Sequence, residues 1–194
     1  MVKADDMPNV VAWIRRCWPV SDATLGKLLE HLTPRRFGKR ECLIFEGALG
    51  GKAYFIENGI TRSYWIVDGE EITTSFTCEG SIVFSMDELY YGRPSEEYVE
   101  AVESVLAYEI SVEEFNRLVE AEPELAHWAR VNHQNEYRRL HRTHKERLSL
   151  PAPERYRAFA KQFPEVCRRA RLSDIASYIG IAPATLSRIR AELF

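Results

Sequence analysis

Hydrophobic residues recur at helical spacing toward both ends of the chain, and they occur in strand-like runs between those ends. Apolar positions three or four apart predict helices over residues 9–18 and 21–32. Residues 35–110 instead carry short runs rich in β-branched and aromatic side chains, separated by glycines. Asp68 and Gly69 form a strong signal for a two-residue hairpin, because that turn needs a left-handed backbone. The middle of the chain therefore predicts a small barrel or roll of short strands.

Helical spacing returns in the second half of the chain. Pro123 can begin a helix, since its missing N–H has no partner in a first turn, and the pattern continues to about residue 149. Pro151 and Pro153 then interrupt the pattern. We expect a stiff hinge at these prolines, followed by another amphipathic helix over residues 154–163.

The segment "LSDIASYIGIAPATLSRIRAEL", residues 172–193, places apolar residues at helical spacing on both sides of one glycine. Gly180 can take the left-handed backbone that ends a helix, and Pro183 is acceptable as the first residue of the next one. Two short helices joined by a tight turn are typical of a helix-turn-helix, whose second helix enters the major groove of DNA. An ordinary helical hairpin that binds nothing has the same pattern.

Charge favours the DNA-binding interpretation. Residues 1–120 carry 12 Lys and Arg against 21 Asp and Glu, net −9, whereas residues 121–194 carry 14 against 8, net +6. Contact with phosphate needs local positive charge, so the net −3 of the whole chain does not oppose it. We therefore predict a C-terminal DNA-binding domain. Its candidate DNA-contacting residues are Ser173, Pro183, Ala184, Thr185, Ser187, Arg188 and Arg190.

Several other classes of protein receive no support from the sequence. No apolar run is long enough to span a membrane, and the N-terminus lacks the charged and then apolar leader of a secreted protein, so we expect a cytoplasmic protein. The cysteines are scattered singly, and His141 with His144 lacks further ligands, so we expect neither a metal site nor a cofactor. We find no pattern of nucleophile, base and acid and expect no enzyme activity.

The order of these elements resembles the cyclic-AMP receptor protein and FNR family of bacterial transcription regulators, in particular its short-tailed members. The resemblance rests on Gly47, Gly59 and Gly80 at the turns of the roll, on the long helix after "EEFNRLV", and on "DIASYIGIAPATLSRI". It implies an α+β fold with a cyclic-nucleotide-binding-type β-roll (jelly roll) and flanking helices. It also implies three parts: a sensor roll at 1–122, a long dimerisation helix at 123–150, and a helix-turn-helix domain at 151–194.

The resemblance further implies that the roll holds an effector, that two copies pair through the long helix, and that the dimer reads a double-stranded operator. The candidate effector pocket comprises Phe84, Ser85, Met86, Ser95, Glu96, Glu97, Thr143 and His144. In cyclic-nucleotide-binding relatives a glutamate meets the ribose and an arginine clamps the phosphate. By register these two positions carry Ser85 and Ser95 here, while Arg93 is expected to be a solvated loop residue.

Serine cannot supply the doubly donating cation that suits a phosphate, and the two carboxylates after Ser95 repel one. We therefore expect that cyclic AMP is not the effector. A ligand of the roll should be neutral or cationic, or the roll is filled by its own side chains such as Phe84 and Met86.

The predicted recognition helix also departs from the family pattern. Its leading arginine and glutamate positions carry Pro183 and Ala184, whereas Thr185 and Arg188 match. An arginine at position 188 can donate two hydrogen bonds to a guanine. The sequence ends soon afterwards, so we expect no β-hairpin wing.

Two alternatives belong to other classes of protein. One is a stand-alone effector-binding module with a vestigial helix-turn-helix, which the departures at positions 183 and 184 and the absent wing would suit. The other is a cupin-type metal enzyme, and the strands lack the histidine and glutamate ligands that it needs.

Overall fold

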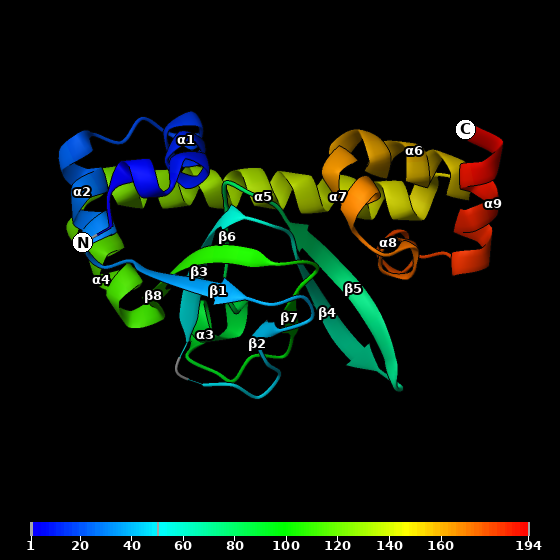
Figure 1. Ribbon diagram of the computed structural model, residues 1–194, viewed down its shortest axis with the longest axis horizontal. Helices are drawn as coiled ribbons and strands as arrows, with labels where there is room; N and C mark the ends of the chain where they lie inside the picture. Colours follow the sequence, from blue (N-terminus) through cyan, green and yellow to red (C-terminus); the bar gives the residue numbers. More distant parts are fainter. Residues whose placement is uncertain (1, 50, 194) are drawn as a thin grey trace.

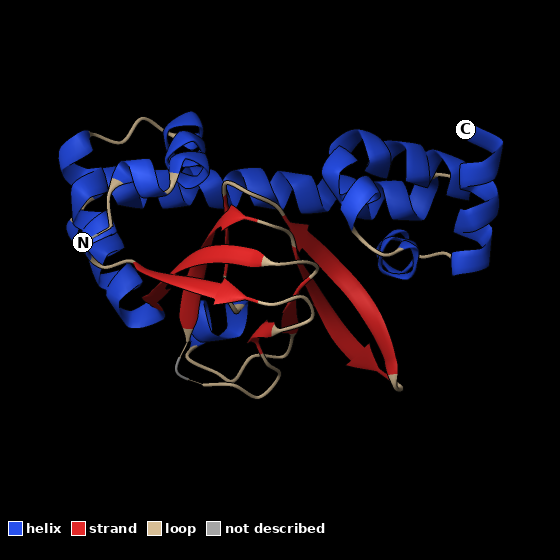
Figure 2. Ribbon diagram, viewed as in Figure 1, coloured by secondary structure: helices blue, strands red, loops and turns tan. Residues whose placement is uncertain are grey.

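The computed structural model describes residues 2–49 and 51–193, and its parts are arranged along one long helix (Figure 1). Helices lie at both ends of the molecule and the strands lie below its centre (Figure 2). The helices are η1 (Ala4–Asp6, a 3-10 helix), α1 (Pro8–Cys17), α2 (Asp22–Glu30), α3 (Met86–Tyr91), α4 (Val112–Ala121), α5 (Pro123–Ser149), α6 (Ala152–Gln162), α7 (Pro164–Arg169), α8 (Leu172–Ile179) and α9 (Pro183–Leu193). The strands are β1 (Thr33–Phe37), β2 (Cys42–Ile44), β3 (Lys52–Asn58), β4 (Thr61–Val67), β5 (Glu70–Thr77), β6 (Ser81–Val83), β7 (Tyr98–Ala101) and β8 (Val105–Ser111).

The strands form a roll of two four-stranded sheets, with strand orders β1-β8-β3-β6 and β2-β7-β4-β5. Neighbouring strands are antiparallel. A cluster of inward-facing residues from both sheets fills the interior, and it consists of Phe37, Leu43, Ile44, Tyr54, Ile56, Val83, Val99, Ala101, Val105 and Ala107. Asp68 and Gly69 join β4 to β5 with φ of 52° and 82°, which is the left-handed hairpin turn that the sequence predicts.

The N-terminal helices and the beginning of α5 cover one outer face of the roll. Trp128 of α5 lies against Phe55 of β3 and Trp13 of α1, with ring centroids 6.3 and 5.2 Å apart. These rings belong to a large buried cluster with Ile14 and Leu28. Burying such apolar area is the main stabilisation that fixes the beginning of α5 on the roll.

The long helix α5 begins at Pro123 and ends at Ser149, just before the prolines that the sequence predicts as a hinge. Leu125 and Trp128 near its beginning are buried, whereas large apolar side chains farther along are exposed. The second half of the helix therefore extends beyond the N-terminal cluster and exposes these apolar side chains.

The C-terminal helices α6 to α9 pack around their own buried cluster, which includes Tyr156, Phe159, Ile175, Leu186 and Ile189. Three residues of the roll, Ile60, Phe76 and Val102, join the same cluster. The structure thus confirms the predicted fold class, an α+β roll with flanking helices, a long helix and a C-terminal helix-turn-helix. Among the described residues, no helix is both long and apolar enough to cross a membrane.

Candidate functional site

The turn between α8 and α9 is built as the sequence predicts. Gly180 has φ of 70°, the left-handed conformation that costs least at glycine. The amide of Ile181 donates to the carbonyl of Ala176 at 3.0 Å, so the chain turns back over the last turn of α8. Pro183 then begins α9.

Buried side chains fix the orientation of α9. Leu186 and Ile189, three positions apart, are 0% and 6% exposed and pack against the other C-terminal helices. The opposite face of the helix therefore points to solvent. Arg155 of α6 supports the turn, because it donates to the carbonyl of Ile179 at 2.9 Å and so satisfies the end of α8.

The predicted DNA-contacting residues fall into two groups by exposure. The exposed group is Ser173, Pro183, Ala184, Ser187 and Arg188, and the half-buried group is Thr185 and Arg190. The exposed residues of α9 lie on one face, at positions related by three and four. Three of these side chains are small, and the fourth is the guanidinium of Arg188, a group that can donate two hydrogen bonds to the edge of a base pair.

Exposed cations surround the C-terminal helices. They include Arg138, Arg142, Lys145 and Arg147 on α5, Arg157 and Lys161 on α6, and Arg168 on α7. α9 lies beyond the C-terminal end of α5, at the far end of the molecule from α1 and α2 (Figure 1). A nucleic-acid interface requires side chains that reach base edges together with positive charge for phosphate, and the C-terminal part of the protein exposes residues of both kinds.

The residues predicted to contact an effector in the roll instead make contacts within the protein itself. Ser85 is buried, and its hydroxyl accepts the amide hydrogen of Glu88 as the N-cap of α3. Met86 begins that helix and is 46% exposed, so it does not fill the roll. Phe84 packs instead against the cluster below the N-terminal helices.

The second predicted segment forms a compact acidic loop. The Ser95 hydroxyl donates to the carbonyl of Glu97 at 3.0 Å, and the Glu96 amide donates to Asp87 at 3.2 Å, which ties the loop to α3. Burial raises the pKa of Glu97 to about 7, and the charge of Asp87 adds to the rise. This loop therefore disfavours an anion. Arg93 is exposed, with its guanidinium 5.9 Å from the ring centroid of Tyr91.

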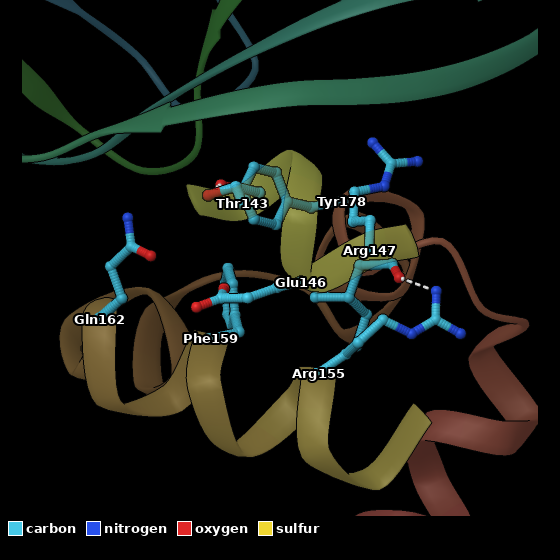
Figure 3. Close-up of a pocket in the computed structure, with 8 residues that line it drawn as sticks. Thr143, Glu146, Arg147, Arg155, Phe159, Gln162 and Tyr178 are labelled. Carbon is cyan, nitrogen blue, oxygen red and sulfur yellow. Dashed lines mark hydrogen bonds between the residues drawn. The ribbon is translucent and has the colours of Figure 1, made fainter. Parts of the chain in front are cut away.

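Thr143 and His144 lie on α5, near the C-terminal helices. The hydroxyl oxygens of Thr143 and Tyr178 are 3.4 Å apart, and both residues line a small cavity with Arg147 and Phe159 (Figure 3). Its volume of about 20 Å³ has room for roughly one water molecule and is too small for an effector. His144 is exposed.

His133, which is not among the predicted effector residues, connects α5 to α3 beside the predicted effector segment. The hydroxyl of Tyr90 on α3 lies 3.2 Å from Nδ1 of His133 on α5, within hydrogen-bond distance. The sequence gives no reason to select His133 from the other histidines of this helix, because the position of α3 is not evident in its spacing. Across residues 2–49 and 51–193 no three His, Cys, Asp or Glu side chains are grouped to hold a metal ion.

Comparison with known proteins agrees with this architecture. Residues 34–122 match the cyclic nucleotide-binding domain family. A comparison with curated protein sequences finds no match. Among solved structures, FixK2 from Bradyrhizobium japonicum has a TM-score of 0.72 at 20% identity over 84% of each chain.

Two further structures cover most of both chains. CLP from Xanthomonas campestris, described as a c-di-GMP-responsive global regulator, has a TM-score of 0.71 at 17% identity, over 89% of this chain and 91% of that one. The catabolite activator protein of Thermus thermophilus has a TM-score of 0.57 at 19% identity, over 93% and 86%. The chain therefore has a cyclic-nucleotide-binding-type roll joined by a long helix to a helix-turn-helix. Its predicted resemblance to the cyclic-AMP receptor protein and FNR family is confirmed at the level of the fold.

Proposed function

We propose that this protein is a homodimeric, DNA-binding transcription regulator without enzyme activity, which acts in the cytoplasm. The observation that carries the proposal is the geometry of α9. Its apolar residues are buried under α6 and α8, while Ala184, Ser187 and Arg188 form an exposed face at the end of the molecule. A helix held in this way can enter a major groove without rearrangement of its own domain.

Pairing of two copies through α5 supports the same proposal. Tyr137, Leu140 and Leu148 are 66%, 48% and 75% exposed and lie on one face of the helix. Arg139, next to Leu140 in the sequence, lies on another face and donates to Ser75 of β5 at 3.4 Å. Exposed apolar side chains on one face of a helix favour a partner, and a second copy along α5 would bring two α9 helices to the same end for two half-sites.

For the roll, we propose a neutral or cationic effector, or none, in place of cyclic AMP. The support is the acidic loop at Ser95 to Glu97 and the use of Ser85 as a helix cap. CLP responds to a different nucleotide, c-di-GMP, so a structure of this type is not tied to cyclic AMP.

Retention on DNA tests the function. The full chain should be retained on genomic DNA fragments at low salt and released steeply as salt rises, because phosphate contacts release counterions. Retention of the variant Arg188→Ala is compared with retention of the control variant Arg117→Ala. Arg117 is an exposed arginine of α4, an element that is distant from α9 in the sequence. No retention at low salt, or retention without a salt slope, would favour the stand-alone module with a vestigial helix-turn-helix.

A further inference from the structure

An arginine of the roll is buried beneath the helix-turn-helix. Arg62 on β4 pairs across the sheet with Glu100 on β7, and both side chains point to the outer face of the roll. They are only 1% and 4% exposed, because α8 covers this face. Burial of a charged side chain costs several kcal/mol unless other charges compensate it.

Carboxylates from both parts of the chain provide that compensation. Arg62 Nη2 lies 2.9 Å from Oε1 of Glu100, and its Nη1 lies 3.2 Å from Oδ1 of Asp174, 112 positions away on α8. Glu71 of β5 also pairs with Arg62. Burial alone would lower the pKa of Arg62, but the hydrogen bond to Glu71 and the charges of Asp174 and Glu100 raise it.

Two further arginines balance the group. Arg171, just before α8, pairs with Asp174 at 3.0 Å and with Glu100 at 3.3 Å, and Arg40 lies 3.8 Å from Glu100. Three guanidinium groups thus face three carboxylates, and we call these six residues the Arg62 cluster: Arg40, Arg62, Glu71, Glu100, Arg171 and Asp174. Without Asp174 the cluster would carry a net positive charge, and the buried Arg62 would lose one of its partners.

Neutral contacts surround the Arg62 cluster on the same helix. The Ser177 hydroxyl of α8 accepts the amide hydrogen of Thr73 at 2.9 Å and donates to the carbonyl of Glu71 at 3.0 Å. Tyr178 packs on Phe76 of β5 with ring centroids 5.6 Å apart. One side of α8 therefore lies on the roll and another side packs against α9, so the docking of α8 sets where α9 lies.

We propose that Arg62 and Asp174 form an ionic latch by which the roll holds the helix-turn-helix, so that the roll as well as the proline hinge positions α9. Asp174 and Arg62 are positioning residues, and neither belongs to the exposed face of α9. The docking is independent of DNA, whereas its consequence for operator binding rests on the proposed function.

Hydrogen exchange in the full chain tests the latch without DNA. The Thr73 amide is protected by Ser177 only while α8 stays docked. The variant Asp174→Asn removes the charge with almost no change of shape, and we expect the Thr73 amide to exchange about tenfold to a hundredfold faster, as for loss of a charge-assisted bond. The Leu186 amide, bonded to Ala182 inside the helix-turn-helix, should keep its protection and so report that this unit stays folded.

Two more variants make the experiment decisive. Glu100→Gln removes the same charge from the roll side, where the stability of α8 itself is not involved, and should accelerate exchange at Thr73 as well. Asp22→Asn is the matched control, because Asp22 is an exposed aspartate of α2 paired with Arg15. If exchange at Thr73 in both cluster variants equals that of the Asp22→Asn control, the latch does not exist.

DNA binding then tests the positioning role. Duplexes are first selected from random DNA. Asp174→Asn should bind a duplex with two half-sites more weakly than the natural sequence does. It should bind a single half-site with the same affinity as the natural sequence. A merely structural defect would lower both affinities. Faster exchange with both affinities unchanged or equally reduced would overturn the positioning role, and faster exchange in a chain that binds no DNA would overturn the proposed function but not the latch.

Discussion

Arg169 on α7 reaches Glu79, 90 positions earlier in the turn between β5 and β6, with its Nη2 2.5 Å from Oε1 of the carboxylate. The same guanidinium pairs with Glu103 in the turn between β7 and β8. Both carboxylates belong to the roll and all three side chains are about one quarter exposed. This second ionic contact joins the roll to the C-terminal helices beside the Arg62 cluster.

Loss of Arg169 should therefore destabilise the whole chain. In Arg169→Gln, Glu79 and Glu103 face each other without a cation, and we expect the free energy of unfolding to fall by about 1–2 kcal/mol. Urea denaturation measures this change in the free energy of unfolding. Arg168→Gln is the control, since Arg168 is 70% exposed and pairs with Glu165 of its own helix, so its effect should stay within about 0.5 kcal/mol. Equal effects of the two substitutions would contradict this role.

These contacts mark the limit of what the sequence could predict. The excess of cations after residue 120 makes the C-terminal part basic, and Arg169 and Arg171 contribute to that excess. In the structure, however, Arg169 and Arg171 both pair with carboxylates of the roll. Such pairs join residues that are dozens of positions apart, so no local spacing indicates them.

Local sequence patterns predict the structure correctly where interactions between neighbouring residues determine it. Apolar spacing with Gly180 and Pro183 predicts both helices of the helix-turn-helix, and Pro123 marks the beginning of α5. The short elements α3, α7, β1 and β6 were not predicted, because each is too short to show a period. Ser85 illustrates the consequence, since the sequence suggests a ligand contact and the structure uses its hydroxyl to cap α3.

The stability of the protein should fall as the pH rises toward neutrality, because of Glu97. Its pKa is raised from 4.5 to about 7 by burial, and by the charge of Asp87. Between these values the folded state binds more protons than the unfolded chain, so the free energy of unfolding decreases with increasing pH. The full shift corresponds to an upper limit of about 3 kcal/mol.

The variant Glu97→Gln should remove most of this pH dependence, as measured by urea denaturation at a series of pH values from 4.5 to about 7. Glu96→Gln is the control, because Glu96 is the exposed neighbour in the same loop. A pH profile that is the same in the natural sequence and in Glu97→Gln would show that Glu97 ionises normally.

Calorimetric titration with cyclic AMP and cyclic GMP should give no saturable binding in the micromolar range. A phosphate that leaves water for the loop at Ser95 to Glu97 loses several kcal/mol of hydration without gaining a cationic donor. Cyclic di-GMP belongs in the same series, because CLP responds to it. Saturable micromolar binding that disappears in Arg93→Ala would mean that this exposed arginine enters the pocket and that the register assigned to the loop is wrong.

The chain should be a dimer in solution, and an acidic residue on the exposed stripe of α5 should make it a monomer. Leu148→Glu places a charge at a side chain that is 75% exposed in one copy and would be buried between two. Sedimentation at micromolar concentration measures the change. Leu49→Glu, at a 66% exposed leucine before β3, should leave the dimer intact. A natural sequence that sediments as a monomer would contradict pairing through α5.

Arg188 and Arg190 should differ in how their loss affects DNA binding. Arg188 lies on the exposed face of α9, whereas Arg190 is half-buried near Tyr156 and Cys167, where its charge opposes the rise in pKa that burial gives to both groups. Arg188→Ala should cost roughly 1–3 kcal/mol on the preferred operator and relax the preference at one base pair, because a bidentate contact to guanine is lost.

Arg190→Ala should instead weaken binding to all sequences alike and reduce the salt slope, as expected for a residue that contacts phosphate. Operators are first selected from random DNA, and affinities are then measured for the selected sequence and its single-base variants at several salt concentrations. Sequence-independent losses of equal size at both positions would show that Arg188 does not read a base, and a change of base preference in Arg190→Ala would exchange the two roles.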